Sequence, residues 1–87
     1  MGRILLVADR KTTIDSLTEI LGKHDYHLTV ASSQRRALRM VRNAGPDLTI
    51  VDLTSAKLSG DKVCTSLRRL TEAPILAIVR EAPADGQ

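Results

Sequence analysis

Residues 46–52 read PDLTIVD, and the central residues 48–51 form a short, largely apolar run closed by the carboxylate of Asp52. A run of this kind is typical of a strand that is buried on both faces of a parallel sheet. The segment ILLVAD, residues 4–9, has the same form, with Asp9 just beyond its apolar part. We therefore expect two interior parallel strands with an acidic residue at the carboxyl end of each.

The sequence predicts two more strands. Residues 27–31 alternate in character, which favours a position near a sheet edge, and residues 75–79 form an apolar run after Pro74. Helical periodicity separates each strand from the next, and this order predicts βαβ units on a parallel sheet with right-handed crossovers. We expect one domain over residues 1–79, followed by a linker or frayed tail over residues 80–87, which have no periodicity.

The three predicted helices have recognisable ends. Thr12 or Thr13 is expected to cap the first helix, which carries Asp15 in its first turn and ends at Gly22. Ser33 is expected to cap the second helix, which residues 43–46 terminate. The residues expected to turn inward are Ile14, Leu17, Ile20 and Leu21 in the first helix, Ala37, Leu38, Met40 and Val41 in the second, and Val63, Cys64, Leu67 and Leu70 in the third.

The composition is that of one globular domain. Of the 87 residues, 43% are hydrophobic and 26% are charged, which excludes collagen, a disordered tail and a disulfide-stapled miniprotein. The single cysteine, Cys64, fits a reducing cytosol and is expected to be a core residue. No apolar run approaches the roughly 20 residues that cross a bilayer, and residues 8–11 end the first run too early for a signal peptide, so we expect a cytoplasmic protein. The net charge of +3 favours an acidic partner only mildly.

Asp9 and Asp52 are the candidate site residues. Sites on open parallel sheets form outside the carboxyl ends of the strands, so both side chains are expected to face one crevice if their strands are neighbours. Paired carboxylates there can hold a hard cation such as Mg²⁺, and one of them can act as a nucleophile toward a phosphoryl group. The alternative is that both aspartates cap loops or helices.

These segments, in this order, resemble the response-regulator receiver domain of two-component signalling. ILLVAD at 4–9 is similar to the first strand of that family, and PDLTIVDL at 46–53 resembles its central strand, with Asp52 at the phospho-acceptor position. Gly60 stands where the family has a glycine before its third helix. The resemblance implies an α/β, flavodoxin-like parallel sheet with strand order 2-1-3-4 and helices on both faces.

The resemblance also implies a metal site, in which Mg²⁺ is held by Asp9, Asp52 and the backbone carbonyl of Thr54. The family usually has two adjacent acids after its first strand, but here the first of them is replaced by Ala8, which weakens the expected metal binding. Arg10 follows, and its guanidinium is expected to pair with one of the two acids and to occupy the place of the metal.

Further departures from the family affect phosphoryl chemistry. Ser55-Ala56 replaces the usual Met-Pro, and Val79 stands where the family has a phosphoryl-sensing Ser or Thr. The family continues with a helix, a fifth strand that carries a lysine contacting the phosphoryl group, and a last helix, whereas this sequence stops before them; Lys57 and Lys62 lie in the wrong region to replace that lysine. An uncovered fourth strand predicts a homo-oligomer that forms through it.

The remaining motifs carry less chemistry. The sequence has neither GxGxxG nor GxxxxGK[ST], so nucleotide binding has no support. His24 and His27 lack a third zinc ligand. The spacing of Arg35, Arg39 and Arg42 places them on one helix face, which can meet phosphates or an acidic partner. No nearby aromatic residue is available for base stacking, so we expect a solvated basic surface and no nucleic-acid binding by this domain.

The function predicted from these residues is a receiver-like signalling module that acts through protein–protein contacts. In this interpretation Asp52 is a vestigial or slow phospho-acceptor, Mg²⁺ binding is weak, the protein is not an enzyme, and the partner is a histidine kinase or an output domain. The alternative is a working receiver that uses Asp52 and Mg²⁺, with the lysine supplied by sequence beyond residue 87. A third hypothesis is a module that contacts nucleic acid through its arginine face.

Overall fold

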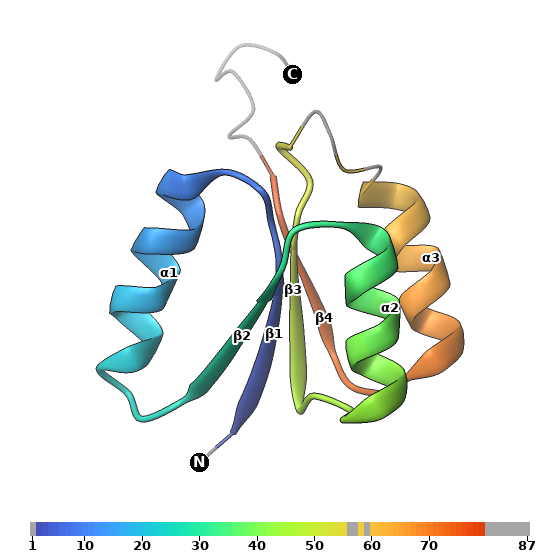
Figure 1. Ribbon diagram of the computed structural model, residues 1–87, viewed down its shortest axis with the longest axis horizontal. Helices are drawn as coiled ribbons and strands as arrows, with labels where there is room; N and C mark the ends of the chain where they lie inside the picture. Colours follow the sequence, from blue (N-terminus) through green and yellow to red (C-terminus); the bar gives the residue numbers. More distant parts are fainter. Residues whose placement is uncertain (1, 56–57, 59, 80–87) are drawn as a thin grey trace, which may run out of the picture.

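The computed structural model describes residues 2–55, 58 and 60–79, and it contains strands and helices in strict alternation (Figure 1). The prediction of a tail at 80–87 lies outside the described residues. The elements are β1 (Arg3–Val7), α1 (Lys11–Gly22), β2 (His27–Ala31), α2 (Gln34–Asn43), β3 (Leu48–Asp52), α3 (Gly60–Leu70) and β4 (Ile75–Ile78).

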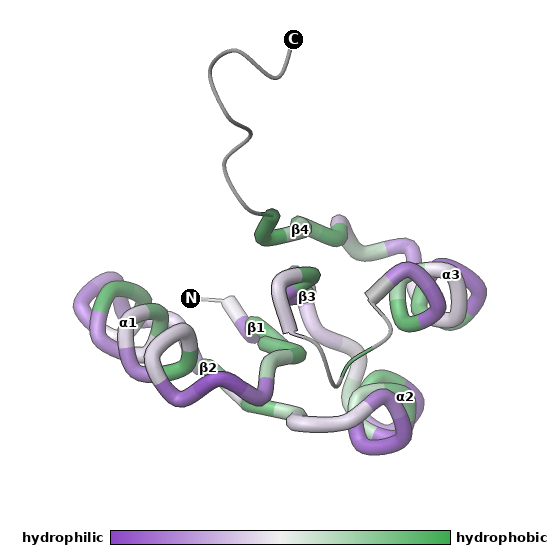
Figure 2. The backbone as a smooth tube through the Cα atoms, turned by 90° about the horizontal axis from the view of Figure 1, so that it is seen from above, coloured by the Kyte–Doolittle hydropathy of each residue, from purple (hydrophilic) through white to green (hydrophobic). Residues whose placement is uncertain are grey.

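The strands form one parallel sheet with the order β2-β1-β3-β4, as predicted. Figure 2 shows α1 on one face of this sheet and α2 with α3 on the other. Val7 of β1 lies opposite both Ala31 of β2 and Val51 of β3, so the carboxyl ends of these strands are level. The fold is α/β and flavodoxin-like, and the loops that follow β1 and β3 emerge at the same edge of the sheet (Figure 1).

Alternation along the strands divides the core into two layers. The first layer packs side chains such as Leu5, Val7 and Val51 against α2 and α3, where Val63 and Leu67 are completely buried. The second layer packs Ile4, Leu6, Ala8 and Ile50 against the apolar stripe of α1, which consists of Ile14, Leu17 and Leu21. Because β1 and β3 are interior strands, both of their faces are covered, and this explains their nearly continuous apolar runs.

The helix ends agree with the sequence at α2 but not at α1. The Oγ of Ser33 accepts a hydrogen bond from the backbone N–H of Arg36 at 3.2 Å, so Ser33 caps α2 as predicted. The predicted cap of α1 by Thr12 or Thr13 is wrong, because the N–H of Ile14 already donates to the carbonyl of Arg10 at 3.0 Å. The first turn of α1 therefore includes both threonines, and Asp15 lies beyond that turn.

Two of the residues predicted to face inward are exposed. The side chains of Ile20 in α1 and Leu70 in α3 are 53% and 38% exposed, respectively. Both stand in the last turn of their helix, and in α1 the next residue, Leu21, still packs against the core. Cys64 is half-buried beside the first core layer. Burial and then Asp61 raise the pKa of its thiol above the usual value, which disfavours the reactive thiolate.

No helix among the described residues is long and apolar enough to span a membrane.

Candidate functional site

The loops at the carboxyl edge of the sheet bring together the two predicted acids. Asp52 is the last residue of β3 and is fully buried, whereas Asp9 lies two residues beyond β1 and is half-buried. The loop after β3 contacts both side chains through two consecutive residues, Thr54 and Ser55. The two acids therefore lie at one edge of the sheet, as predicted, and the same loop makes a hydrogen bond to each of them.

Thr54 holds one oxygen of the Asp52 carboxylate. The backbone N–H and the hydroxyl of Thr54 both donate to Oδ1 of Asp52, at 2.9 and 2.5 Å. This is a local turn in which an aspartate accepts from the residue two positions ahead. The other oxygen, Oδ2, is buried and has no hydrogen-bond partner among the described residues. An unsatisfied buried carboxylate oxygen is costly, so Oδ2 is the atom of this site best placed to accept a ligand.

Ser55 holds the second acid. The Ser55 hydroxyl donates to Oδ1 of Asp9, and its oxygen accepts from the N–H of Leu58 at 3.4 Å. Ser55 itself is buried. Its side chain therefore ties the loop after β3 to the loop after β1, a role that the sequence analysis did not predict. The available signal was a hydroxyl at a loop position where the family usually has methionine.

Arg10 reaches this site indirectly. Its guanidinium Nη1 donates to Oγ1 of Thr54 at 3.2 Å, while the Thr54 hydroxyl donates its own proton to Asp52. The predicted direct pairing of Arg10 with an acid is wrong, since in the part of the chain that the structure describes the one ion pair within 4.0 Å joins Lys23 and Glu19. The Thr54 hydroxyl has donated to the carboxylate and retains an acceptor lone pair, which Arg10 uses.

The third acidic position of the site is apolar. Continuing the β1–β3 register one residue past Val7 and Val51 places Ala8 opposite Asp52, and Ala8 is fully buried in the α1-side core. Among residues 2–55, 58 and 60–79, no cluster of three or more His, Cys, Asp or Glu side chains could hold a metal ion. Val79, one residue beyond β4, is 64% exposed and has no hydroxyl to offer.

The oxygen atoms of Asp9 and Asp52 suit a hard divalent cation, but they provide only two negatively charged ligands. Asp9 and Asp52 supply two carboxylates, and one carboxylate oxygen of Asp52 has no hydrogen bond from the residues that the structure describes. Oxygen donors of this type suit Mg²⁺, and the sequence analysis adds the backbone carbonyl of Thr54 to the set. When bound, the ion would neutralise negative charge at this edge. Oδ1 of each carboxylate already accepts a hydrogen bond from a hydroxyl group. This hydroxyl would compete with the metal ion for the oxygen.

The predicted basic surface makes no ion pair within 4.0 Å with these carboxylates in the described part of the chain. Arg35, Arg39 and Arg42 are exposed on α2, on the side opposite its buried residues Ala37 and Val41. The acidic side chains therefore lie at the carboxyl edge of the sheet, and the basic side chains lie on the exposed face of α2.

The chain thus has a four-stranded parallel sheet of order 2-1-3-4 with a buried aspartate, Asp52, at the end of its third strand. Residues 4–85 match the model of the response regulator receiver domain. The chain belongs to this family. It is a receiver domain of two-component signal transduction, as the resemblance implied.

Relatives support this assignment of a receiver domain. The sensory transduction protein RegX3 of Mycobacterium tuberculosis is 31% identical over 78 residues, which cover 90% of this chain and 34% of RegX3. The activated N-terminal receiver domain of Klebsiella pneumoniae RstA is similar with a TM-score of 0.81 and 26% identity, covering 94% of this chain and 70% of that one. A chain in the crystal structure of histidine kinase ThkA with the response regulator TrrA has the same TM-score and identity, and is matched over 100% of this chain and 76% of its own length. The chain thus spans about a third of the length of RegX3.

Proposed function

We propose that this receiver domain signals chiefly through protein contacts and that Asp52 accepts a phosphoryl group slowly or not at all. The observation that carries the proposal is the hydrogen-bonded state of the acids: Asp52 is tied to Thr54, and Asp9 is tied to Ser55. In this role the domain is not an enzyme. Its natural partners are a histidine kinase, as in the complex of TrrA with ThkA, or an output domain.

The first argument for a weakened acceptor concerns charge. Phosphoryl transfer is catalysed by groups that neutralise the negative oxygens of the transition state. A bound divalent ion supplies part of this neutralisation, and the buried methyl group of Ala8 removes one carboxylate that would hold the ion. Val79 supplies no hydroxyl after β4. Both substitutions therefore reduce stabilisation of the same developing charge.

The second argument concerns the atoms that remain. Oδ1 of Asp52 accepts two hydrogen bonds from Thr54, and the Thr54 hydroxyl is itself held by Arg10. A ligand that needs this oxygen must first break these bonds. Oδ1 of Asp9 is occupied in the same way by the buried Ser55. These bonds stabilise the arrangement without a ligand. They disfavour the state in which Oδ1 of Asp52 and Oδ1 of Asp9 are released to bind a metal ion or a phosphoryl group.

One observation favours the alternative, a working receiver. Oδ2 of the buried Asp52 has no partner in the described residues, and a cation or an incoming phosphoryl group would satisfy it. In that alternative Asp52 is the nucleophile and Mg²⁺ is held by Asp9, Asp52 and the Thr54 carbonyl.

The two functions differ in their response to Mg²⁺ and beryllofluoride. We expect NMR titration of the labelled chain with Mg²⁺ to give small, non-saturating shifts at Asp9 and Asp52 at millimolar concentrations, and beryllofluoride to add no tight complex. A Thr18→Ala variant, altered on the exposed side of α1, serves as the control for folding and labelling. Saturable shifts centred on both acids, followed by stoichiometric beryllofluoride binding, would establish the working receiver instead.

Removing the guanidinium of Arg10 is expected to improve Mg²⁺ binding. Arg10→Ala releases the Thr54 hydroxyl from its cationic donor and removes a positive charge from the site. We expect Mg²⁺ affinity to rise by about threefold, since a charge near a partly exposed site contributes well under 1.4 kcal/mol. Isothermal titration calorimetry measures the change. Lys11→Ala removes an exposed charge from the next residue and should have a smaller effect; equal effects, or a weaker affinity in Arg10→Ala, would contradict the role of Arg10.

Self-association of the 87-residue chain is also expected. β4 (Ile75–Ile78) is an edge of the described sheet, and Leu76 on it is 54% exposed. An apolar, uncharged edge strand is a template for pairing with a second copy. We expect sedimentation velocity to show a growing dimer fraction with concentration, and Leu76→Lys to reduce it. Ile20→Lys, which adds the same charge at a side chain of similar exposure on α1, should leave it unchanged. A single monomer at high concentration in the unaltered chain contradicts the prediction.

A further inference from the structure

The positive charge of this protein is concentrated in one helix. The chain has 13 Lys and Arg against 10 Asp and Glu, and α2 (Gln34–Asn43) contains four of the arginines and no acidic residue. The rest of the chain therefore carries nine basic residues against ten acidic ones and is close to neutral. The four arginines of α2 are Arg35, Arg36, Arg39 and Arg42, and all of them are exposed.

The fold gives these arginines no evident internal role. Within the described ranges, no carboxylate lies within 4.0 Å of any of their guanidinium groups. Arg42 is in the last turn of α2, where a cation complements the helix dipole. Arg35 and Arg36 are in the first turn, after the cap residue Ser33, where the dipole disfavours a cation. Arg42 therefore stabilises α2 through the helix dipole, whereas Arg35 and Arg36 do not.

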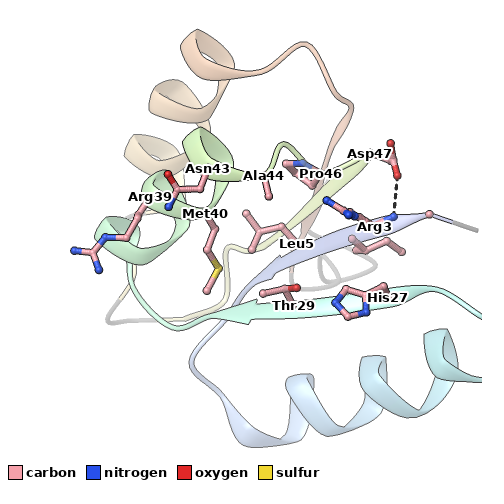
Figure 3. Close-up of a pocket in the computed structure, with 12 residues that line it drawn as sticks. Arg3, Leu5, His27, Thr29, Arg39, Met40, Asn43, Ala44, Pro46 and Asp47 are labelled. Carbon is pink, nitrogen blue, oxygen red and sulfur yellow. Dashed lines mark hydrogen bonds between the residues drawn. The ribbon is translucent and has the colours of Figure 1, made fainter.

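Two hollows adjoin the arginine face, and they meet at Arg39 and Asn43. The larger is a groove of about 600 Å³ between the C-terminal half of α2 and strands β1 and β2. Figure 3 shows Met40 pointing from α2 into this space, toward Leu5 and Thr29, whereas Arg39 points outward along its rim. The smaller hollow, about 360 Å³, runs over α2 itself and is lined by Arg35, Leu38 and Arg42 together with the two shared residues.

The charges around the larger groove are also mainly positive. Arg3 lines it from β1 and Arg39 from α2, and among the described residues the one acidic side chain in its lining is Asp47. The Asp47 carboxylate already accepts a hydrogen bond from the backbone N–H of Arg3 at 2.8 Å, drawn in Figure 3. The groove thus combines a partly apolar floor with a basic rim, which is complementary to an acidic chain that carries an apolar side chain.

The length of the arginine face argues for an extended ligand. Arg35 and Arg42 are seven residues apart, which corresponds to about 10 Å along a helix axis. A single small anion cannot span this distance, but a peptide segment with several carboxylates can. Nucleic acid fits less well, because the apolar floor of the groove, unlike its basic rim, has no favourable contact with a phosphate backbone, and the one aromatic residue of the chain, Tyr26, lies in neither lining.

We propose that the arginine face of α2 and the adjoining groove form a docking surface for an acidic protein segment, with an apolar side chain of that segment seated against Met40. This surface is independent of Asp52 and of whether it is phosphorylated. The guanidinium groups attract and orient the carboxylates, and the groove supplies the desolvated anchor that gives such an interface its specificity.

Fluorescence anisotropy with short labelled peptides tests the proposal on the whole 87-residue chain. The main probe is a glutamate-rich peptide with two central leucines; the comparison probes replace the leucines by serine, or the glutamates by lysine. We expect the first peptide to bind most tightly, the serine peptide to bind more weakly, and the lysine peptide not to bind. Added salt should weaken binding without abolishing it, because the apolar anchor is not screened.

Variants locate the site. Replacing both arginines in R39Q/R42Q is expected to weaken binding of the main probe about tenfold. K11Q/K23Q removes two charges from the two ends of α1, the first helical residue and the C-cap, on the other face of the sheet, and should change the affinity less than twofold. Met40→Ala should weaken binding of the leucine peptide but not of the serine peptide, with circular dichroism confirming that the variant is folded.

Three outcomes would overturn the proposal. The first is no binding of the leucine peptide at low salt by the folded chain. The second is an equal loss of affinity in K11Q/K23Q and R39Q/R42Q, which would show non-specific attraction to the basic chain. The third is tighter binding of a short DNA duplex than of the peptide, abolished by R39Q/R42Q, which would assign the surface to nucleic acid.

Discussion

Replacing Ala8 with aspartate is expected to tighten Mg²⁺ binding by about tenfold or more, because the number of charged ligands largely sets the affinity of such sites. Ala8 is fully buried, and continuing the β1–β3 register one residue past Val7 and Val51 places it opposite Asp52, so a carboxylate there joins the two that are present. The measurement is calorimetric titration of the variant and the unaltered chain with Mg²⁺.

A neutral substitution of the same size separates charge from shape. Ala8→Asn should gain little affinity, because its amide oxygen carries no full charge. Ala8→Asp should also unfold more easily without the ion, since a carboxylate is then buried in the apolar layer beneath α1, and it should regain stability as Mg²⁺ is added. Equal affinities for Mg²⁺ in Ala8→Asp and the unaltered chain would show that Ala8 is not what limits the site.

Leu67→Ala is expected to lower the free energy of unfolding by about 2–5 kcal/mol. The Leu67 side chain is completely buried where α3 packs on the sheet, and its removal leaves a cavity in the larger core layer. In a domain of this size the loss is a large part of the total stability. Urea denaturation followed by circular dichroism measures it.

Leu70 provides the matched control on the same helix. Its side chain is 38% exposed, so Leu70→Ala should cost less than about 1 kcal/mol. The same substitution three residues apart thus distinguishes burial from helix propensity. If the two variants are destabilised equally, the placement of α3 against the sheet is wrong.

The strands could be predicted because each satisfies a strong local condition. The β1 and β3 runs are apolar on both sides of the chain, which only interior strands require, and β2 alternates, as an edge strand with one covered face does. Ser33 was equally predictable, because a cap depends on atoms three residues away. In these cases pattern and structure agree because the decisive partner is close in sequence or shared by a whole element.

Two of the errors, at Ile20 and Leu70, arise where the partner is distant in sequence. Periodicity assigns Ile20 and Leu70 to the apolar stripe, but it does not say which residues of the last turn the sheet covers: Leu21 packs against the core, whereas Ile20 does not. For α1, the start of the helix is fixed by the short connection from β1, and this places Thr12 and Thr13 within the first turn.

The candidate site shows the same limit. Topology alone places Asp9 and Asp52 at one edge, so their proximity follows from the order of the strands. The partner of Arg10 does not follow from the order of the strands, because it lies on the loop after β3, 44 residues away in sequence. The Thr54 hydroxyl is that acceptor, and Ser55 is the second hydroxyl donor to the acids. Neither the Arg10–Thr54 contact nor the Ser55–Asp9 contact can be predicted from the spacing of these residues in the sequence.

Incubation of the 87-residue chain with acetyl phosphate and Mg²⁺, followed by intact-mass spectrometry, tests the central claim most directly. Asp52→Asn, which keeps the size of the side chain but removes the nucleophilic carboxylate, is the control. The weakened charge neutralisation at this site predicts that the unaltered chain and the control gain the same small or undetectable phosphoryl mass. Stoichiometric phosphorylation that disappears in Asp52→Asn would contradict the account and assign the protein to the working receivers.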